Sequence, residues 1–162
     1  IQWGRLSDGH GNVTWRSSTS ADNKPSTTTL SSTDVPGNNL FITNPGGNGD
    51  WRSPQNDNLW QGVAGTNNPC PSGFRVPTQA EINAEIGSMN NTNDAFTSVF
   101  KLPAAGFVPY TGANIVSAGQ VFNFTSSTVT GTTRSLTNFT ATAKAINNVG
   151  RGSGNIVRCI KN

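Results

Sequence analysis

The sequence predicts a β-rich fold of short strands and many turns, with one clear α-helix. Hydrophobic residues make up 33% of the 162 positions, charged residues 12%, and glycine occupies 18 of them. A chain of this length suits one domain, residues 1–162, with a compact core beneath a large polar surface. The low charge and frequent glycine are typical of exported β-rich proteins, so we expect an extracellular or cell-surface location.

The first third of the chain alternates strand-like runs with polar loops. Residues 1–6 (IQWGRL) and 13–15 (VTW) are expected to form strands around the turn SDGHGN. The Ser/Thr-rich tract 17–33 cannot bury enough apolar surface to fold by itself, which predicts an exposed loop. Residues 44–50 (NPGGNGD) predict a second loop. Residues 50–63 hold two tryptophans at neither helical nor strand spacing, and predict an irregular segment pinned by those rings.

The one clear helix begins at Thr78. The run TQAE forms a capping box, in which the Thr78 hydroxyl accepts from the N–H of Glu81 and the Glu81 carboxylate reaches back. One apolar stripe follows at Ile82, Ile86 and Met89. The helix is expected to end at Gly87 or in the asparagine-rich run after it, and residues 94–100 to add one helical turn.

The remainder of the chain predicts strands. They are expected at residues 101–109, 119–125, 133–139, 142–147 and 155–161.

The chain has only two cysteines, Cys70 and Cys159, so one intramolecular pair is possible. A disulfide between them would tie the start of the helix to the last strand, as the exported composition favours. The alternative is two buried thiols.

The charge pattern excludes some partners. The net charge is +3, and the basic residues are scattered without interleaved aromatic residues, so nucleic-acid binding is not predicted. No apolar run approaches the roughly 18 residues that a membrane span needs. No signal peptide is visible, and the chain starts at Ile1, which predicts a processed product or a piece of a longer protein.

No residue set predicts catalysis or a cofactor. His10 is the only histidine, and no nucleophile elbow accompanies it and nearby Asp8, so we expect a turn residue. Glu81 and Glu85 are one helical turn apart and could act as paired carboxylates. The cap already explains Glu81, however, and a solvated face explains Glu85. The run GRGSG at 150–154 lacks the setting of a phosphate loop and predicts a turn.

Two kinds of ligand site are considered. Oxygen ligands for calcium could come from Asn48, Asp50, Asn56 and Asp57. Their spacing does not match an EF-hand, and a pair of Asx turns explains them equally, so Asp50 and Asp57 remain candidates only. A sugar-stacking platform could come from Trp3, Trp15, Trp51 and Trp60. At least three of these are expected in the core.

The surface is predicted to be glycosylated. N-x-Thr sequons begin at Asn12, Asn90, Asn123 and Asn138. Such sequons also arise by chance in a chain rich in asparagine and threonine. The tract 17–33, with its proline, is a further candidate for O-linked glycans.

Several ordered motifs resemble those of a known family. CPSGFRVPTQAE (70–81) resembles the signature CPSGWRLPTEAEW, and KLPAAGFVPY (101–110) resembles the strand KLPAAGYR. FTSST (124–128) lies where that family has YWSST, and NIVRCIKN (155–162) resembles its closing SVRCIKD. The chain thus resembles the Fibrobacter-type major paralogous domain (FISUMP). The match covers most of the chain and is poorest over residues 16–45.

The resemblance implies a C-type-lectin-like fold related to the formylglycine-generating, sulfatase-modifying enzymes. That fold is α+β, with a twisted antiparallel sheet, one or two short helices and long irregular loops. The family is mostly exported and bacterial, and its cysteines match Cys70 and Cys159. The enzymatic relatives use a reactive cysteine pair close together near the C-terminus, so their activity is not carried over.

Two departures from the family bear on assembly. Thr125 replaces a tryptophan, and the strand that usually precedes the QWGR stretch is missing. Either the sequence is a fragment, or that sheet edge is open or filled by another chain. If another chain fills the edge, copies are expected to associate by lending a strand, with residues 1–6 or 155–162 as donors. The alternative is that the missing strand belongs to the same polypeptide.

The expected function is a non-enzymatic, secreted or cell-surface lectin-like domain, in adhesion or as a subunit of an extracellular assembly such as a fibre. One alternative is a module that binds glycans or proteins through variable loops, as in phage or bacterial surface receptors. The other is an enzyme of the formylglycine-generating type. Glycans and copies of the chain are the expected partners, and no cofactor is expected.

Overall fold

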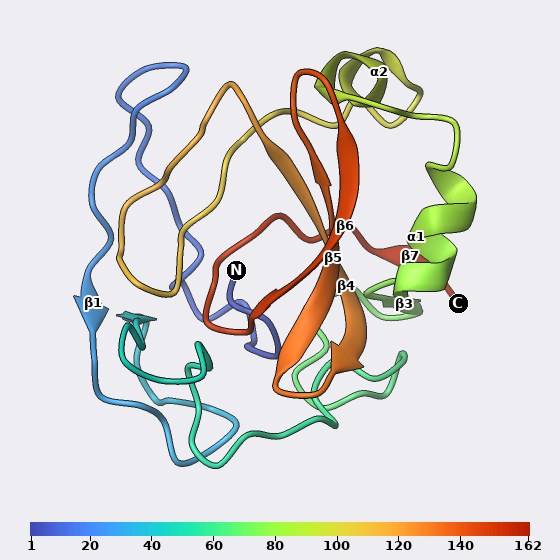
Figure 1. Cartoon of the computed structure of the whole chain (residues 1–162). Coiled ribbons are helices and arrows are strands. Elements are labelled where there is room, and N and C mark those ends of the chain that lie inside the picture. The colour runs from blue at the N-terminus through green and yellow to red at the C-terminus, as the bar shows by residue number, and fades with distance from the viewer.

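Irregular backbone connects short helices and strands in the computed structural model, which describes residues 1–162 (Figure 1). The fold is α+β and mostly antiparallel, as expected. The helices are α1 (Gln79–Glu85) and α2 (Thr92–Thr97). The strands are β1 (Ser26–Thr27), β2 (Phe41–Ile42), β3 (Phe74–Arg75), β4 (Phe122–Thr130), β5 (Thr133–Phe139), β6 (Lys144–Gly150) and β7 (Ile160–Lys161). Neither helix has the length and apolar content needed to cross a bilayer.

The largest sheet is antiparallel, with strand order β4-β5-β6. Helix α1, β3 and β7 lie on one side of it, and the N-terminus and β1 lie on the other (Figure 1). Strand β5 has the predicted bounds, whereas β4 and β6 start later than the sequence predicts. Ser117 and Gly119 adopt positive φ, which delays β4 to Phe122. A turn closed by the Thr140 N–H and the Ala143 carbonyl delays β6. Two very short pairs complete the strands, β1 with β2 in parallel and β3 with β7 antiparallel.

Helix α1 begins as its sequence predicts. Thr78 Oγ1 accepts from the Glu81 N–H at 3.3 Å, and the Thr78 N–H donates to the Glu81 carboxylate at 2.8 Å. Arg75 adds two bonds to the same carboxylate, at 2.8 and 2.5 Å. The Arg75 guanidinium, helped by the Thr78 N–H, lowers the pKa of Glu81 to about 2. The apolar stripe of α1 then packs in one core cluster with the sheet residues Phe122, Phe124 and Phe139.

A second core cluster is built on tryptophans. Trp3, Trp51 and Trp60 are buried, which confirms that at least three of the four lie in the core, whereas Trp15 is 43% exposed. Every buried indole N–H donates to a backbone carbonyl: Trp3 to Ser126, Trp51 to Trp3, and Trp60 to Arg5. The irregular segment 50–63 is thus pinned by its rings, as the sequence predicts.

Residues 1–6 do not form the expected strand. Gly4 has φ of 80° and turns the chain after a single bridge from Gln2 to Gly154. The buried Gln2 amide then joins three segments. Its oxygen accepts from the Ile42 N–H and from Arg5, and its nitrogen donates to Ile42 and Gly152 carbonyls at 2.7 and 2.6 Å. Residues 2–5 are buried in this fold, which does not favour residues 1–6 as a lent strand, and that expected role stays a prediction.

His10 lies in the expected turn but is buried. Its Nε2 accepts from the Gln2 N–H at 2.9 Å, and its Nδ1 bonds to the Asp8 carboxylate. Burial, with the nearby charge of Arg5, lowers the pKa of His10 to about 4. The neutral ring therefore acts as a fixed link between the turn and the N-terminal segment.

The expected strand at 101–109 is also absent. Pro103 and Pro109 lack the N–H that a regular ladder needs. What remains are two isolated bridges, Phe107 to Val116 and Val108 to Gly154. Of the expected strand 155–161, only Ile160–Lys161 is regular.

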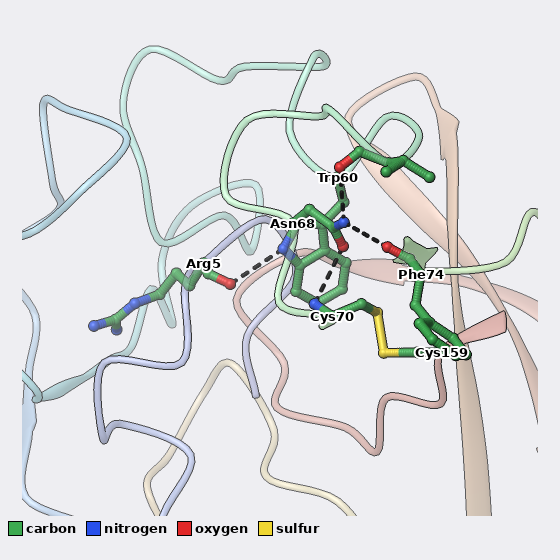
Figure 2. Close-up of a disulfide and its surroundings, with 7 residues drawn as sticks. Arg5, Trp60, Asn68, Cys70, Phe74 and Cys159 are labelled. Carbon is green, nitrogen blue, oxygen red and sulfur yellow. Dashed lines mark hydrogen bonds between the residues drawn. A yellow bond between two sulfur atoms is a disulfide. The ribbon is translucent and has the colours of Figure 1, made fainter. Parts of the chain in front are cut away.

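Cys70 and Cys159 form the predicted disulfide, with their Cα atoms 5.8 Å apart (Figure 2). The loop before it is ordered by Asn68, which accepts from the Cys70 N–H and donates to the Phe74 and Val63 carbonyls. The bridge holds the segment before β7 against the loop that leads into β3.

Reduction of this disulfide should lower the thermal midpoint strongly. The bridge closes a loop across 89 residues of sequence separation, for which the chain-entropy model gives about 4–5 kcal/mol. Calorimetry with and without reductant measures the effect, and the double variant Cys70→Ser, Cys159→Ser should match the reduced native chain. Free thiol in the denatured, unreduced protein would contradict the bridge.

Acid should destabilise the chain through His10. Its pKa falls from 6.5 to about 4 on folding, so between these values the unfolded chain binds a proton that the folded chain does not. The free energy of unfolding should therefore decrease as pH falls from 6.5 to 4, by on the order of 3 kcal/mol. Since His10 is the only histidine, a single NMR titration of the folded chain measures its pKa. The same chain in urea is the control, and a folded-state pKa near 6.5 would refute the assignment.

Candidate functional site

The segment 154–159 is paired through Gly154 and Ile156 along one edge, and through Asn155 alone along the other. Gly154 exchanges two hydrogen bonds with Val108, at 2.8 and 2.9 Å. Asn155 does the same with Ile1, at 3.0 and 2.9 Å. Successive residues of a strand direct their backbone groups to opposite edges. Gly154 and Asn155 therefore define two edges, one facing Val108 and one facing Ile1.

The edge that faces Ile1 is open beyond Asn155. Val157 and Cys159 lie outside the assigned strands. We expect them to direct their N–H and C=O groups to this edge if the alternation at Gly154 and Asn155 continues along the segment. None of these four groups makes a hydrogen bond within the chain. On the opposite edge, the Ile156 carbonyl accepts from the Thr125 N–H of β4. The open edge thus offers two residues in the spacing that an antiparallel strand would pair with.

A groove of about 480 Å³ lies beside this open edge. Its apolar lining includes Ile1, Val13, Trp15, Phe107, Ile115 and Val157. Lys24 is the one charged residue in the lining, and its ammonium bonds to the carbonyls of His10 and Asn12. Burial lowers the pKa of Lys24. The groove, which we call the edge groove, therefore suits an extended segment that carries apolar side chains.

A second hollow of about 560 Å³ lies between α1 and the segment leading into β7. Its floor includes Ile82, Ile86, Leu102 and Phe124. Glu81, Glu85, Arg158 and Lys161 lie at its rim. The Glu81 carboxylate is bonded to the Arg75 guanidinium.

The calcium candidates lie beside an arginine. Asp57 accepts from Arg151 Nη2 at 2.6 Å, and Asp50 lies 3.8 Å from Arg151 Nη1. Burial raises the pKa of Asp50. The Asp50 side chain also accepts from the Arg52 N–H, and Asn48 accepts from the Asp50 N–H, as in Asx turns. A guanidinium thus supplies the positive charge that the two carboxylates share. No three His, Cys, Asp or Glu side chains are grouped to hold a metal ion.

The four sequons differ in accessibility. Asn12 and Asn90 are exposed, and glycosylation there stays a prediction. Asn123 is buried, and its amide donates to Asn155 and accepts from Asn138. The Asn123 amide is therefore not available for a glycan in the folded chain, because sheet packing encloses it. The tract 17–33 is mostly exposed, as expected, and it is irregular apart from isolated bridges and the short β1.

No family model, curated protein or solved structure matches this chain.

Proposed function

We propose that the chain is a non-enzymatic, secreted or cell-surface domain of the C-type-lectin-like, FISUMP type. In this proposal it acts in adhesion or as a subunit of an extracellular assembly, and the edge groove accepts a strand edge from another copy. The observation that carries the proposal is the pair of unbonded backbone positions at Val157 and Cys159 beside an apolar groove. The disulfide supports an oxidising compartment.

Strand addition is the recognition mode that fits an open edge. An antiparallel strand that continues the line of Ile1 would exchange up to four hydrogen bonds with Val157 and Cys159. Alternate side chains would enter the groove and supply apolar contact. The acceptor edge is rigid, because Asn155 is paired at one end and Cys159 is held by the disulfide at the other. Little ordering entropy is lost when such an edge is filled.

Strand β6 is the donor that we infer. Residues 2–5 are buried, and residues 155–162 are held by the disulfide and by the pairing of β7 with β3. Strand β6 pairs only with β5 and exposes residues 145–148. Its one charged side chain, Lys144, is directed away to the Ile86 and Gly87 carbonyls, at 3.3 and 2.8 Å.

An exposed edge strand without charged side chains readily pairs with an edge strand of another chain. Pairing β6 of one copy with the open edge of the next joins two different surfaces. Such a contact does not have to close into a ring and can extend into a fibre. The proposal therefore accounts for two unprotected edges with one contact.

A proline at Val157 should block assembly without unfolding the chain. The Val157 N–H makes no bond within the chain, so its removal leaves the native hydrogen bonds intact, whereas a docked strand loses one bond and meets the proline ring. We expect the native chain to assemble with rising concentration in light scattering and to form fibres in electron microscopy. Val157→Pro should lower the association constant at least about tenfold.

The matched control is Val157→Ala, which keeps the N–H and removes only side-chain contact, and should still assemble. Ile146→Asp on β6 should weaken assembly from the donor side, because it places a charge on the exposed strand. Thermal melts check that each variant is folded. A native chain that stays monomeric at high concentration, or a Val157→Pro variant that assembles like the native chain, would end the proposal.

A further inference from the structure

A small hollow of about 180 Å³ lies on the face of the β4-β5-β6 sheet that is turned away from α1. Thr137 marks the opposite face, because its hydroxyl accepts from Gln79 of α1 at 2.7 Å. Its neighbours Leu136 and Asn138 therefore point the other way, into the hollow. The polar lining consists of Asn123, Asn138, Asn147, Ser153 and Asn155. We call this hollow the asparagine pocket.

Three of the amides form a directed chain. Asn138 Nδ2 donates to Asn123 Oδ1 at 2.6 Å, and Asn123 Nδ2 donates to Asn155 Oδ1 at 2.9 Å. Asn155 Nδ2 donates in turn to the Ser153 carbonyl at 3.3 Å. Each bond fixes the orientation of the next amide, so the polar lining is preorganised.

The outer end of this chain has unused hydrogen-bonding capacity. Asn138 Oδ1 makes no hydrogen bond within the chain, and Asn147 makes none with its side chain. An amide carries two donors and an acceptor with two lone pairs. Asn138 and Asn147 therefore present both donors and acceptors at the mouth of the pocket.

The rest of the lining is apolar and uncharged. Phe107, Leu136 and Val149 complete the pocket, and no charged side chain lines it. Behind it, the fully buried Arg134 donates to the Ser153 carbonyl at 3.3 Å, while its Nε and Nη1 have no partner. An unpaired guanidinium makes the region behind the pocket positive, which favours ligand oxygens over ligand ammonium groups.

We propose that the asparagine pocket binds one uncharged sugar residue. Neighbouring hydroxyls each donate and accept, which matches the paired donors and acceptors of Asn138 and Asn147. The C–H face of a sugar ring suits the contact with Phe107 and Val149. The small volume limits the occupant to a single ring. The inference does not rest on strand addition, because the amide chain and the unused amide groups all belong to one copy of the chain. Asn147 does lie on β6, so assembly of its variant is measured separately.

The test follows side-chain amide signals by NMR in isotope-labelled chain. The probes are the methyl glycosides of glucose, galactose, mannose and N-acetylglucosamine, with glucuronic acid as the anionic comparison. At least one neutral glycoside should shift the Asn138 and Asn147 amide signals in a saturable way. Asn147→Ala should weaken that binding about tenfold, as expected for loss of a hydrogen-bonding group.

Asn148→Ala is the matched control, because it alters the neighbouring residue on the other face of β6, where Asn148 accepts from Ser135. It should leave sugar binding unchanged. Asn147 has no side-chain partner, so its variant should fold, and thermal melts verify this. The proposal is overturned if no neutral glycoside shifts these signals, if only the anionic sugar binds, or if Asn147→Ala binds like the native chain. Light scattering of Asn147→Ala reports assembly separately.

Discussion

The buried amide of Gln2 is the interaction on which the rest of this structure depends. Of 65 backbone hydrogen bonds, 43 lie outside the helices and strands, so regular ladders do not hold the chain together. Gln2 joins the N-terminal segment, β2 and the loop at Gly152 through its own oxygen and nitrogen. Because unpaired polar groups are costly in a buried place, its loss would leave several backbone groups unsatisfied at once.

The buried Arg151 connects further segments to the N-terminal part of the chain, close to the candidate sites. Arg151 lies over the Trp3 ring at 4.9 Å and bonds to Asp57 and to the Gly131 carbonyl, while its own carbonyl accepts from the Trp3 N–H. The segment from Gly150 to Asn155 is thereby fixed from several directions. The open edge at Val157 starts from this fixed point and ends at the disulfide, which explains how irregular backbone can present a strand edge in a defined position.

Local signals allowed part of the fold to be predicted from sequence. The capping box at Thr78 is contained in four residues. The chain has only two cysteines, so a disulfide could have only one pairing within the chain. The strand expected at 101–109 fails because its prolines remove donors. The positions of residues 1–6 and of Asn123 depend on partners far along the chain, Ile42 and Asn155, which no local pattern reveals. The edge groove and the asparagine pocket also combine segments that are far apart in the sequence, so no local pattern predicts them.

The two open edges of the chain differ in a way that bears on assembly. The edge at Val157 and Cys159 is recessed beside a groove, whereas β6 is exposed along most of its length. Proteins usually protect such edges with charge, proline or a covering segment. Here Lys144 is bound to carbonyls at the end of α1, and the remaining β6 side chains are neutral. The strand addition proposed above would join these two different surfaces, as a head-to-tail assembly does.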